Sequence, residues 1–310
     1  MITGKEKNET RLAVRTRLEI SLAIALIVLI VELAGGFEFS SSALVADALH
    51  IFTDIFAIGF SLFALTLSAR PPTRSLTYGY HRVEVFASLI NGISLFVIAA
   101  LIGVGAYLKI ASHAQINIFG TVTIALIALA LNLLSRQILS GSHNVARNVD
   151  APYLLDEDLN VKSATTHVYG DALASLAVVV GALLVYLTGN YIFDPIVAIL
   201  IGLIVLRSAV ATTWAGLSIM LERSPVQNMS ALESELEKVN GVSDVHDLHV
   251  WKICSHITIA TLHACLNDDG RNKRLETMNE LEVRLSKSYG IQHATIQLED
   301  VCCVPKHGHL

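Results

Sequence analysis

The chain has 310 residues, of which 53% are hydrophobic and 16% are charged, and its mean hydropathy is +0.57. Because soluble domains carry about 25% charged residues, this composition indicates a membrane protein rather than a soluble one. The net charge of -5 argues against a nucleic-acid partner, and the basic residues are not clustered as a phosphate-binding patch would require.

Six segments are long and apolar enough to cross a bilayer as helices, for which about 20 residues are needed. In chain order they cover residues 18–36, 42–68, 83–108, 118–138, 163–187 and 193–214. The first is too long for the apolar region of a signal peptide, so no cleaved signal is expected. At the start of the sixth, Asp194 and Pro195 are predicted as the N-cap and the first helical residue.

The basic residues of the connecting segments predict the orientation. They are concentrated before the first span and in the second and fourth connections, whereas the third connection has only Lys109 and the first and fifth have none. Because positively charged loops remain in the cytosol, both termini are expected there. Residues 1–17 then form a cytosolic N-terminal segment and residues 18–220 a transmembrane domain.

A different composition begins near Leu221 and predicts a separate domain over residues 221–310. Its expected elements, from hydrophobic periodicity, are helices over 230–239 and 271–289 and strands over 242–254, 257–266 and 294–299. The expected fold class is therefore an α-helical membrane protein with six transmembrane helices and a C-terminal cytosolic α+β domain, ferredoxin-like with the order αββαβ.

All the cysteines lie in this last domain: Cys254, Cys265, Cys302 and Cys303. Disulfides are rare in the cytosol, so we expect free thiols or metal ligands.

Two spans repeat one pattern, a histidine followed four residues later by an aspartate. The pairs are His50 with Asp54 in the second span and His167 with Asp171 in the fifth. This spacing places both side chains on one face of a helix. Two such pairs facing each other supply two imidazoles and two carboxylates, a tetrahedral ligand set that Zn²⁺ accepts.

The energetic cost of intramembrane charge favours a functional interpretation of these pairs. A charge at mid-membrane costs about 2.5–3.5 kcal/mol, and no Lys or Arg lies in the middle of a span to balance Asp54 or Asp171. A bound dication is the simplest counter-charge. The alternative, a polar contact between helices, is less favoured because the pattern occurs twice. Asp47, one turn before His50, either lines the outward path or is an interfacial carboxylate.

The motifs at residues 46–54, 78–84, 167–171, 194–195 and 246–251 resemble those of the cation diffusion facilitator family, in its zinc/cadmium/cobalt-resistance and zinc-transporter branch. The resemblance covers nearly the whole chain. It implies a homodimer that exports Zn²⁺, with Cd²⁺ and Co²⁺ as further candidates, in exchange for protons. Its transport site maps onto His50, Asp54, His167 and Asp171. A histidine at the position of His50 accompanies a preference for Zn²⁺ over Cd²⁺ in the family.

The same resemblance implies further sites. It assigns metal ligands in the cytosolic domain to His246, His263, Glu299, Cys302 and Cys303, with His307 and His309 as additional candidates. The branch separates its two cysteines by two residues, whereas here they are adjacent. Arg82 and Glu222 match a charge interlock at the membrane–cytosol boundary. The absence of a long His-rich loop between spans four and five favours a prokaryotic plasma (inner) membrane protein.

Three other functions remain open on the residues alone. Imidazole suits several metals, so a transporter of Mn²⁺, Ni²⁺ or Fe²⁺ fits the same ligands. A metal-sensing receptor without transport also fits. An intramembrane metalloenzyme is disfavoured, because catalytic zinc keeps an open position beside three protein ligands and no His-Glu-x-x-His motif occurs. We therefore expect no enzyme, with lipid, divalent metal ions and protons as the partners.

Overall fold

Six long helices dominate the computed structural model, which describes residues 4–146 and 155–302. They are α1 (Gly4–Glu38), α2 (Ser42–Ser68), α3 (Arg82–Ser112), α4 (Ile118–Ala146), α5 (Leu155–Thr188) and α6 (Phe193–Met220). Each contains a stretch long and apolar enough to cross a membrane. The six predicted spans are confirmed, and α1 also extends back to Gly4, ahead of the first predicted span.

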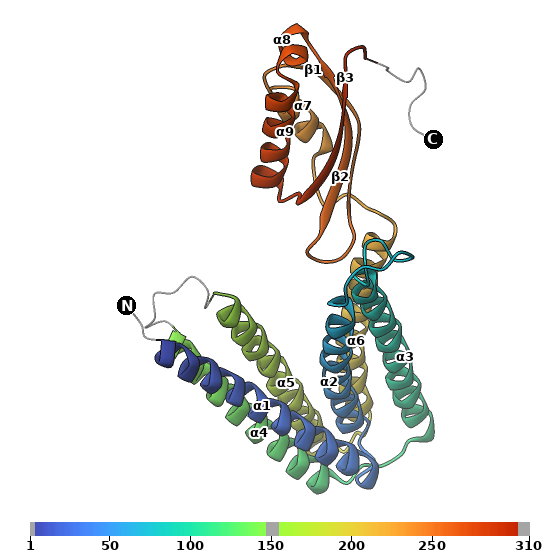
Figure 1. Cartoon of the computed structure of the whole chain (residues 1–310). Coiled ribbons are helices and arrows are strands. Elements are labelled where there is room, and N and C mark those ends of the chain that lie inside the picture. The colour runs from blue at the N-terminus through green and yellow to red at the C-terminus, as the bar shows by residue number, and fades with distance from the viewer. Residues whose placement is uncertain (1–3, 147–154, 303–310) are drawn as a thin grey trace. The chain divides into compact units, whose positions relative to one another are not determined.

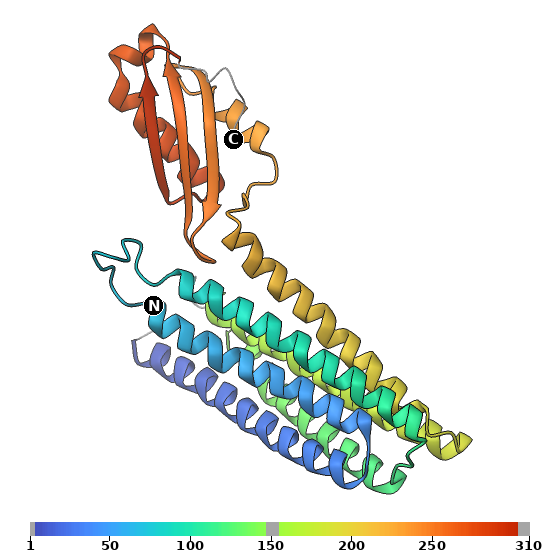
Figure 2. The same cartoon turned by 90° about the vertical axis from the view of Figure 1, so that its right-hand side faces the viewer.

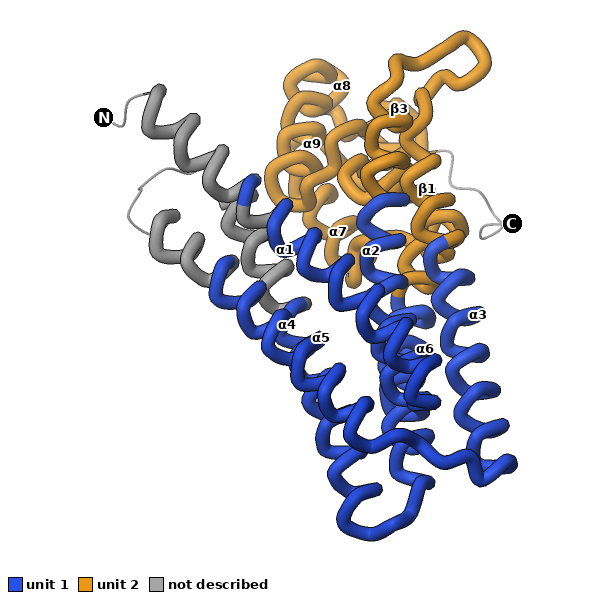
Figure 3. The backbone as a smooth tube through the Cα atoms, turned by 90° about the horizontal axis from the view of Figure 1, so that it is seen from below, with its two compact units in different colours: residues 1–60, 91–211 blue, residues 61–90, 212–310 orange. Residues whose placement is uncertain are grey.

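The chain divides into two compact units, residues 1–60 with 91–211 and residues 61–90 with 212–310 (Figure 3). In the first unit, α1, α4 and α5 lie side by side (Figure 1). Buried side chains of α2, α3 and α6, among them Leu44, Ile102 and Val205, share a core with residues of α4 and α5. Large apolar side chains such as Leu101 and Phe119 are exposed, as expected for helices that face lipid.

The first turn of α2 is capped by a residue of another helix. Asp194 accepts hydrogen bonds from Ser41 Oγ at 2.5 Å and from the Ser42 backbone N–H at 2.8 Å, and it pairs with Lys109 at 3.0 Å. The prediction that Asp194 caps its own helix is wrong. Because α6 already begins at Phe193, Asp194 lies inside its first turn and its carboxylate serves α2 instead.

The second unit contains the C-terminal domain. Its elements are α7 (Met229–Leu236), β1 (Val242–Lys252), β2 (Thr258–Leu266), α8 (Asp268–Asn272), α9 (Arg274–Tyr289) and β3 (His293–Glu299). The strands lie in the order β1-β2-β3, with β1 antiparallel and β3 parallel to β2 (Figure 2). Buried leucines of α7 and α9, including Leu236 and Leu281, pack with Leu262 of β2. The αββαβ order is confirmed, with the short α8 as an addition that Asn267 caps.

Candidate metal sites

The first candidate site begins on α2, where His50 and Asp54 lie one helical turn apart. His50 Nδ1 is 3.7 Å from Asp54 Oδ2. This nitrogen is buried and makes no hydrogen bond among the described residues. A buried polar atom without a hydrogen bond is costly, and a metal ion is one group that would satisfy it.

Asp171 of α5 completes the described part of this site. His50 Nε2 is 4.0 Å from Asp171 Oδ1, and one ligand atom from each of the three residues lies within 4.8 Å of the others. Nitrogen and oxygen atoms bound to tetrahedral Zn²⁺ at about 2.0–2.2 Å lie roughly 3.3–3.6 Å apart. Small side-chain movements would therefore bring these three groups onto one ion.

The fourth predicted ligand, His167, lies on α5 one turn before Asp171. Its side chain is outside the part of the chain whose side chains are described. The structure thus brings together three of the four predicted residues, and the place of the fourth on the same helix agrees with the pattern.

Asp47 lies inside a polar network rather than at an open path. It is 0% exposed, and Ser175 Oγ donates a hydrogen bond to its Oδ2 at 3.1 Å. Asn132 in turn donates to Ser175 at 3.3 Å, so the network links α2, α4 and α5. Glu32 of α1 is also fully buried. In this conformation Asp47 contributes to helix packing, and its role in an outward path stays a prediction.

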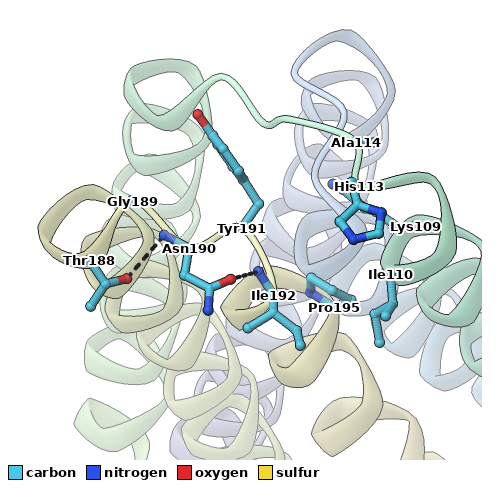
Figure 4. A pocket seen from close by; sticks show the side chains of 10 residues that line it. All are labelled: Lys109, Ile110, His113, Ala114, Thr188, Gly189, Asn190, Tyr191, Ile192 and Pro195. Atoms are coloured by element: carbon cyan, nitrogen blue, oxygen red, sulfur yellow. Dashed lines mark hydrogen bonds between the residues drawn. The ribbon is translucent and has the colours of Figure 1, made fainter.

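A pocket beside the loop between α5 and α6 is separate from these ligands (Figure 4). Its lining includes Lys109, His113 and Asn190. Asn190 accepts a hydrogen bond from the Ile192 N–H at 3.1 Å and donates its own N–H to Thr188 at 3.2 Å. These bonds shape the turn, and the pocket contains none of the predicted metal ligands.

The second candidate site lies on the sheet of the C-terminal domain. His246 of β1 is directly opposite His263 of β2, and Glu299 ends β3 one diagonal position from His263. Side chains at diagonal positions of neighbouring strands are within reach of each other. His263 Nδ1 is 2.9 Å from Glu299 Oε1, and His246 Nε2 is 3.5 Å from Glu299 Oε2. Three of the five residues that the resemblance assigned as ligands in this domain are therefore adjacent.

The donor types of this cluster suit a divalent transition metal. Two imidazoles and a carboxylate are ligands that Zn²⁺ binds readily. His246 Nε2 is buried and has no hydrogen-bond partner in the described chain. Asp244, which sequence reasoning missed, lies 3.0 Å from His246 Nδ1 and would hold the ring in place, as carboxylates commonly do for metal-binding histidines.

The cysteines do not all lie where they were expected. The structure joins Cys265 and Cys302 in a disulfide, contrary to the expectation of free thiols or metal ligands, and so pairs Cys302, an expected ligand, with Cys265. The physical reason is the parallel pairing of β2 with β3: Cys265 lies opposite Glu299, and Cys302 follows only three residues later. Cys254 is a buried free thiol. Cys303, His307 and His309 lie outside the described residues.

The two residues of the predicted interlock form an ion pair within the second unit. Arg82 at the start of α3 lies 3.1 Å from Glu222, just after α6. The two side chains are 46% and 58% exposed, and exposed pairs contribute only about 0–1 kcal/mol. The same unit places Glu84 against His256 at 3.3 Å, a contact that neither spacing nor motif predicted.

Comparisons with known proteins cover both domains. The family model described as "Cation efflux transmembrane domain" matches residues 18–221, and "Cation efflux protein, cytoplasmic domain" matches residues 225–301. The metal cation efflux system protein CzcD of Cupriavidus metallidurans is 34% identical over 92% of this chain and 87% of its own length. The zinc transporter ZitB of Escherichia coli is 33% identical, over 91% of this chain and 86% of its own. A "Cadmium, cobalt and zinc/H(+)-K(+) antiporter" of Bacillus subtilis is 30% identical, over 90% and 89%.

Proposed function

Because this chain belongs to the cation diffusion facilitator family, we propose that it exports Zn²⁺ from the cytosol in exchange for protons. Its relatives are named for efflux of metal cations, zinc, cadmium and cobalt, which makes Cd²⁺ and Co²⁺ further candidate substrates. The observation that carries the proposal is the convergence of His50, Asp54 and Asp171 from two membrane helices. We assign His167 as the fourth ligand, from its place on α5.

The charge of this ligand set accounts for exchange with protons. Two ionised carboxylates, Asp54 and Asp171, balance one divalent cation, so the loaded site is neutral. Two protons bound in place of the cation give the same net charge. Because net charge inside a bilayer is costly, both loaded forms can be carried through the membrane domain, whereas the empty, doubly negative site is disfavoured.

Competition between metal and protons for the same ligands sets the direction of metal transport, from the cytosol to the outer side. Metal binding requires neutral imidazoles and ionised carboxylates, so the less acidic cytosolic side favours metal at these atoms. On the more acidic outer side, protons occupy the same atoms and release the metal. The direction of net transport is set by this competition on the two sides, while a ligand shifts the protein between inward- and outward-facing states only if its affinity for the two differs.

The cytosolic domain fits a regulatory metal. His246, His263 and Glu299 would hold Zn²⁺ there, and the domain would join two copies of the chain as a homodimer, in line with its match to the family's cytoplasmic domain. Both termini then face the cytosol and the protein is a multi-pass protein of the plasma membrane. The relatives are named as transporters and efflux proteins, which favours transport over catalysis.

The test is Zn²⁺/H⁺ exchange in proteoliposomes. Asp171→Ala removes one carboxylate that lies 4.0 Å from His50, so Zn²⁺-driven proton movement should fall to the level of empty liposomes while the protein still folds. Asp268→Ala, a change at a carboxylate that is 95% exposed in the C-terminal domain, serves as the matched control and should retain exchange. Full exchange by Asp171→Ala would remove the assignment of the transport site.

A further inference from the structure

The disulfide between Cys265 and Cys302 lies beside a third potential metal ligand, Asp244. One ligand atom from each of these residues lies within 4.8 Å of the others. Strand pairing explains the placement, because Asp244 of β1 is directly opposite Cys265 of β2. Cys302 reaches the same end of the sheet just after β3, and its Cα is 5.4 Å from that of Cys265.

The two sulfur atoms need little movement to bind one ion once they are separated. Thiolates on tetrahedral Zn²⁺ at about 2.3 Å lie roughly 3.8 Å apart. Cys265 is 1% exposed, so its position is fixed by the sheet. Cys302 is exposed and lies beyond the end of β3, so rotation of its side chain can open the gap.

The cytosol favours the reduced form of this pair. Low-molecular-weight thiols keep most cytosolic cysteines reduced. Two such thiols convert the protein disulfide into two cysteine thiols and are themselves joined as a small-molecule disulfide. A divalent metal ion then replaces the two thiol protons, which are released to the solvent.

We propose that the reduced protein holds a divalent metal ion through Asp244, Cys265 and Cys302, and that the disulfide is the closed form of this site. Two thiolates and a carboxylate suit Zn²⁺, Co²⁺ or Cd²⁺ rather than Mg²⁺ or Ca²⁺. In this proposal Cys302 shares the ion with Cys265 of β2 and not with its neighbour Cys303. It is independent of the transport site and does not require that the protein moves metal.

This site adjoins the cluster of His246, His263 and Glu299. His246 Nδ1 is 3.0 Å from Asp244 and 3.9 Å from Cys265 Sγ, while its Nε2 faces Glu299 at 3.5 Å. Asp244 therefore serves one cluster as the hydrogen-bond partner of His246 and the other as a ligand. Because one carboxylate takes part in both, occupancy of the thiolate site changes the orientation and basicity of His246.

Cobalt absorption tests the site in the full-length protein in detergent. The protein is reduced with a phosphine, the phosphine is removed without air, and Co²⁺ is added. Thiolate ligands give a sulfur-to-cobalt charge-transfer band in the near ultraviolet, which imidazole and carboxylate ligands do not produce. We expect the band in the reduced protein, its loss in the oxidised protein, and a decrease to about half or less of its intensity in Cys302→Ser, which removes one of the two thiolates.

The matched controls are Cys254→Ser and Cys303→Ser, which should keep the band. His263→Ala should also keep it, because that residue belongs to the neighbouring cluster. Cys302 is exposed, so its replacement should leave the circular dichroism spectrum unchanged. The proposal is overturned by a full band in Cys302→Ser, by loss of the band in Cys303→Ser, or by its absence from reduced protein whose four thiols are shown to be free by counting. A disulfide that withstands the reductant overturns it as well.

Discussion

At the scale of single residues, His50 is the group that joins the two helices of the proposed transport site. Its Nδ1 faces Asp54 at 3.7 Å and its Nε2 faces Asp171 at 4.0 Å. A neutral imidazole has one nitrogen that can bind a metal and one that carries a proton. Only one nitrogen of His50 can therefore bind the ion, and both carboxylates must reach the ion on the side of that nitrogen.

Replacement of this imidazole should change metal selectivity. His50→Asp adds a carboxylate, which can bind through two oxygens and so supports larger coordination shells. We expect the ratio of Cd²⁺ to Zn²⁺ transport to rise about tenfold, equivalent to ~1.4 kcal/mol of differential binding. Initial rates in proteoliposomes measure this ratio. His113→Asp, a change at an exposed histidine of the first unit, is the control, and an unchanged ratio in His50→Asp would contradict the role of His50 in selectivity.

At the scale of elements, the helix that carries His50 and Asp54 is fixed at its first turn by α6. Asp194 accepts hydrogen bonds from the start of α2 and pairs with Lys109 of α3. Asp194 is 2% exposed, so its carboxylate contacts these partners rather than water. One carboxylate thus ties three helices together at the end where α2 begins.

Replacement of Asp194 should lower the stability of the first unit. Loss of one partner of a buried hydrogen bond costs about 1–3 kcal/mol. Asp194→Ala leaves the Ser42 N–H and Lys109 without this carboxylate, so it should lower the thermal unfolding temperature in detergent. Asp194→Asn keeps an oxygen that accepts from the Ser42 N–H and should show a smaller decrease. Equal unfolding temperatures for the wild type and Asp194→Ala would show that the cap contributes nothing measurable.

These elements also show how far the sequence alone can lead. The spans could be predicted because a bilayer requires apolar helices of a set length. The common face of His50 and Asp54 could be predicted because the two residues are four positions apart on one helix. The sequence does not predict that Asp194 binds the first turn of α2, because this contact depends on how closely α6 approaches α2. The sequence also does not predict that Cys302 is the partner of Cys265, since periodicity predicts strands but not the parallel pairing of β2 with β3.

At the scale of the whole molecule, the proposed site links metal movement to the proton gradient through its charge. The described ligands include two carboxylates, Asp54 and Asp171. An exchange of one divalent cation for two protons leaves the net charge of this site unchanged. The carrier should then respond to a difference in pH across the membrane and not to the membrane potential.

This argument predicts the energetics of transport in sealed proteoliposomes. An acidic lumen protonates the ligands on the release side, so Zn²⁺ accumulation should increase as the lumen becomes more acidic. For two protons per ion, the limiting accumulation ratio rises roughly 100-fold per pH unit of gradient, since each tenfold factor corresponds to ~1.4 kcal/mol. Luminal zinc measured with a fluorescent indicator gives this ratio.

Nigericin, which collapses the pH gradient, should abolish accumulation, whereas a change in membrane potential at constant pH should leave it unaltered. Accumulation that persists with nigericin would exclude proton-driven export, and a ratio near tenfold per pH unit that changes with potential would mean that only one of the two carboxylates exchanges its proton.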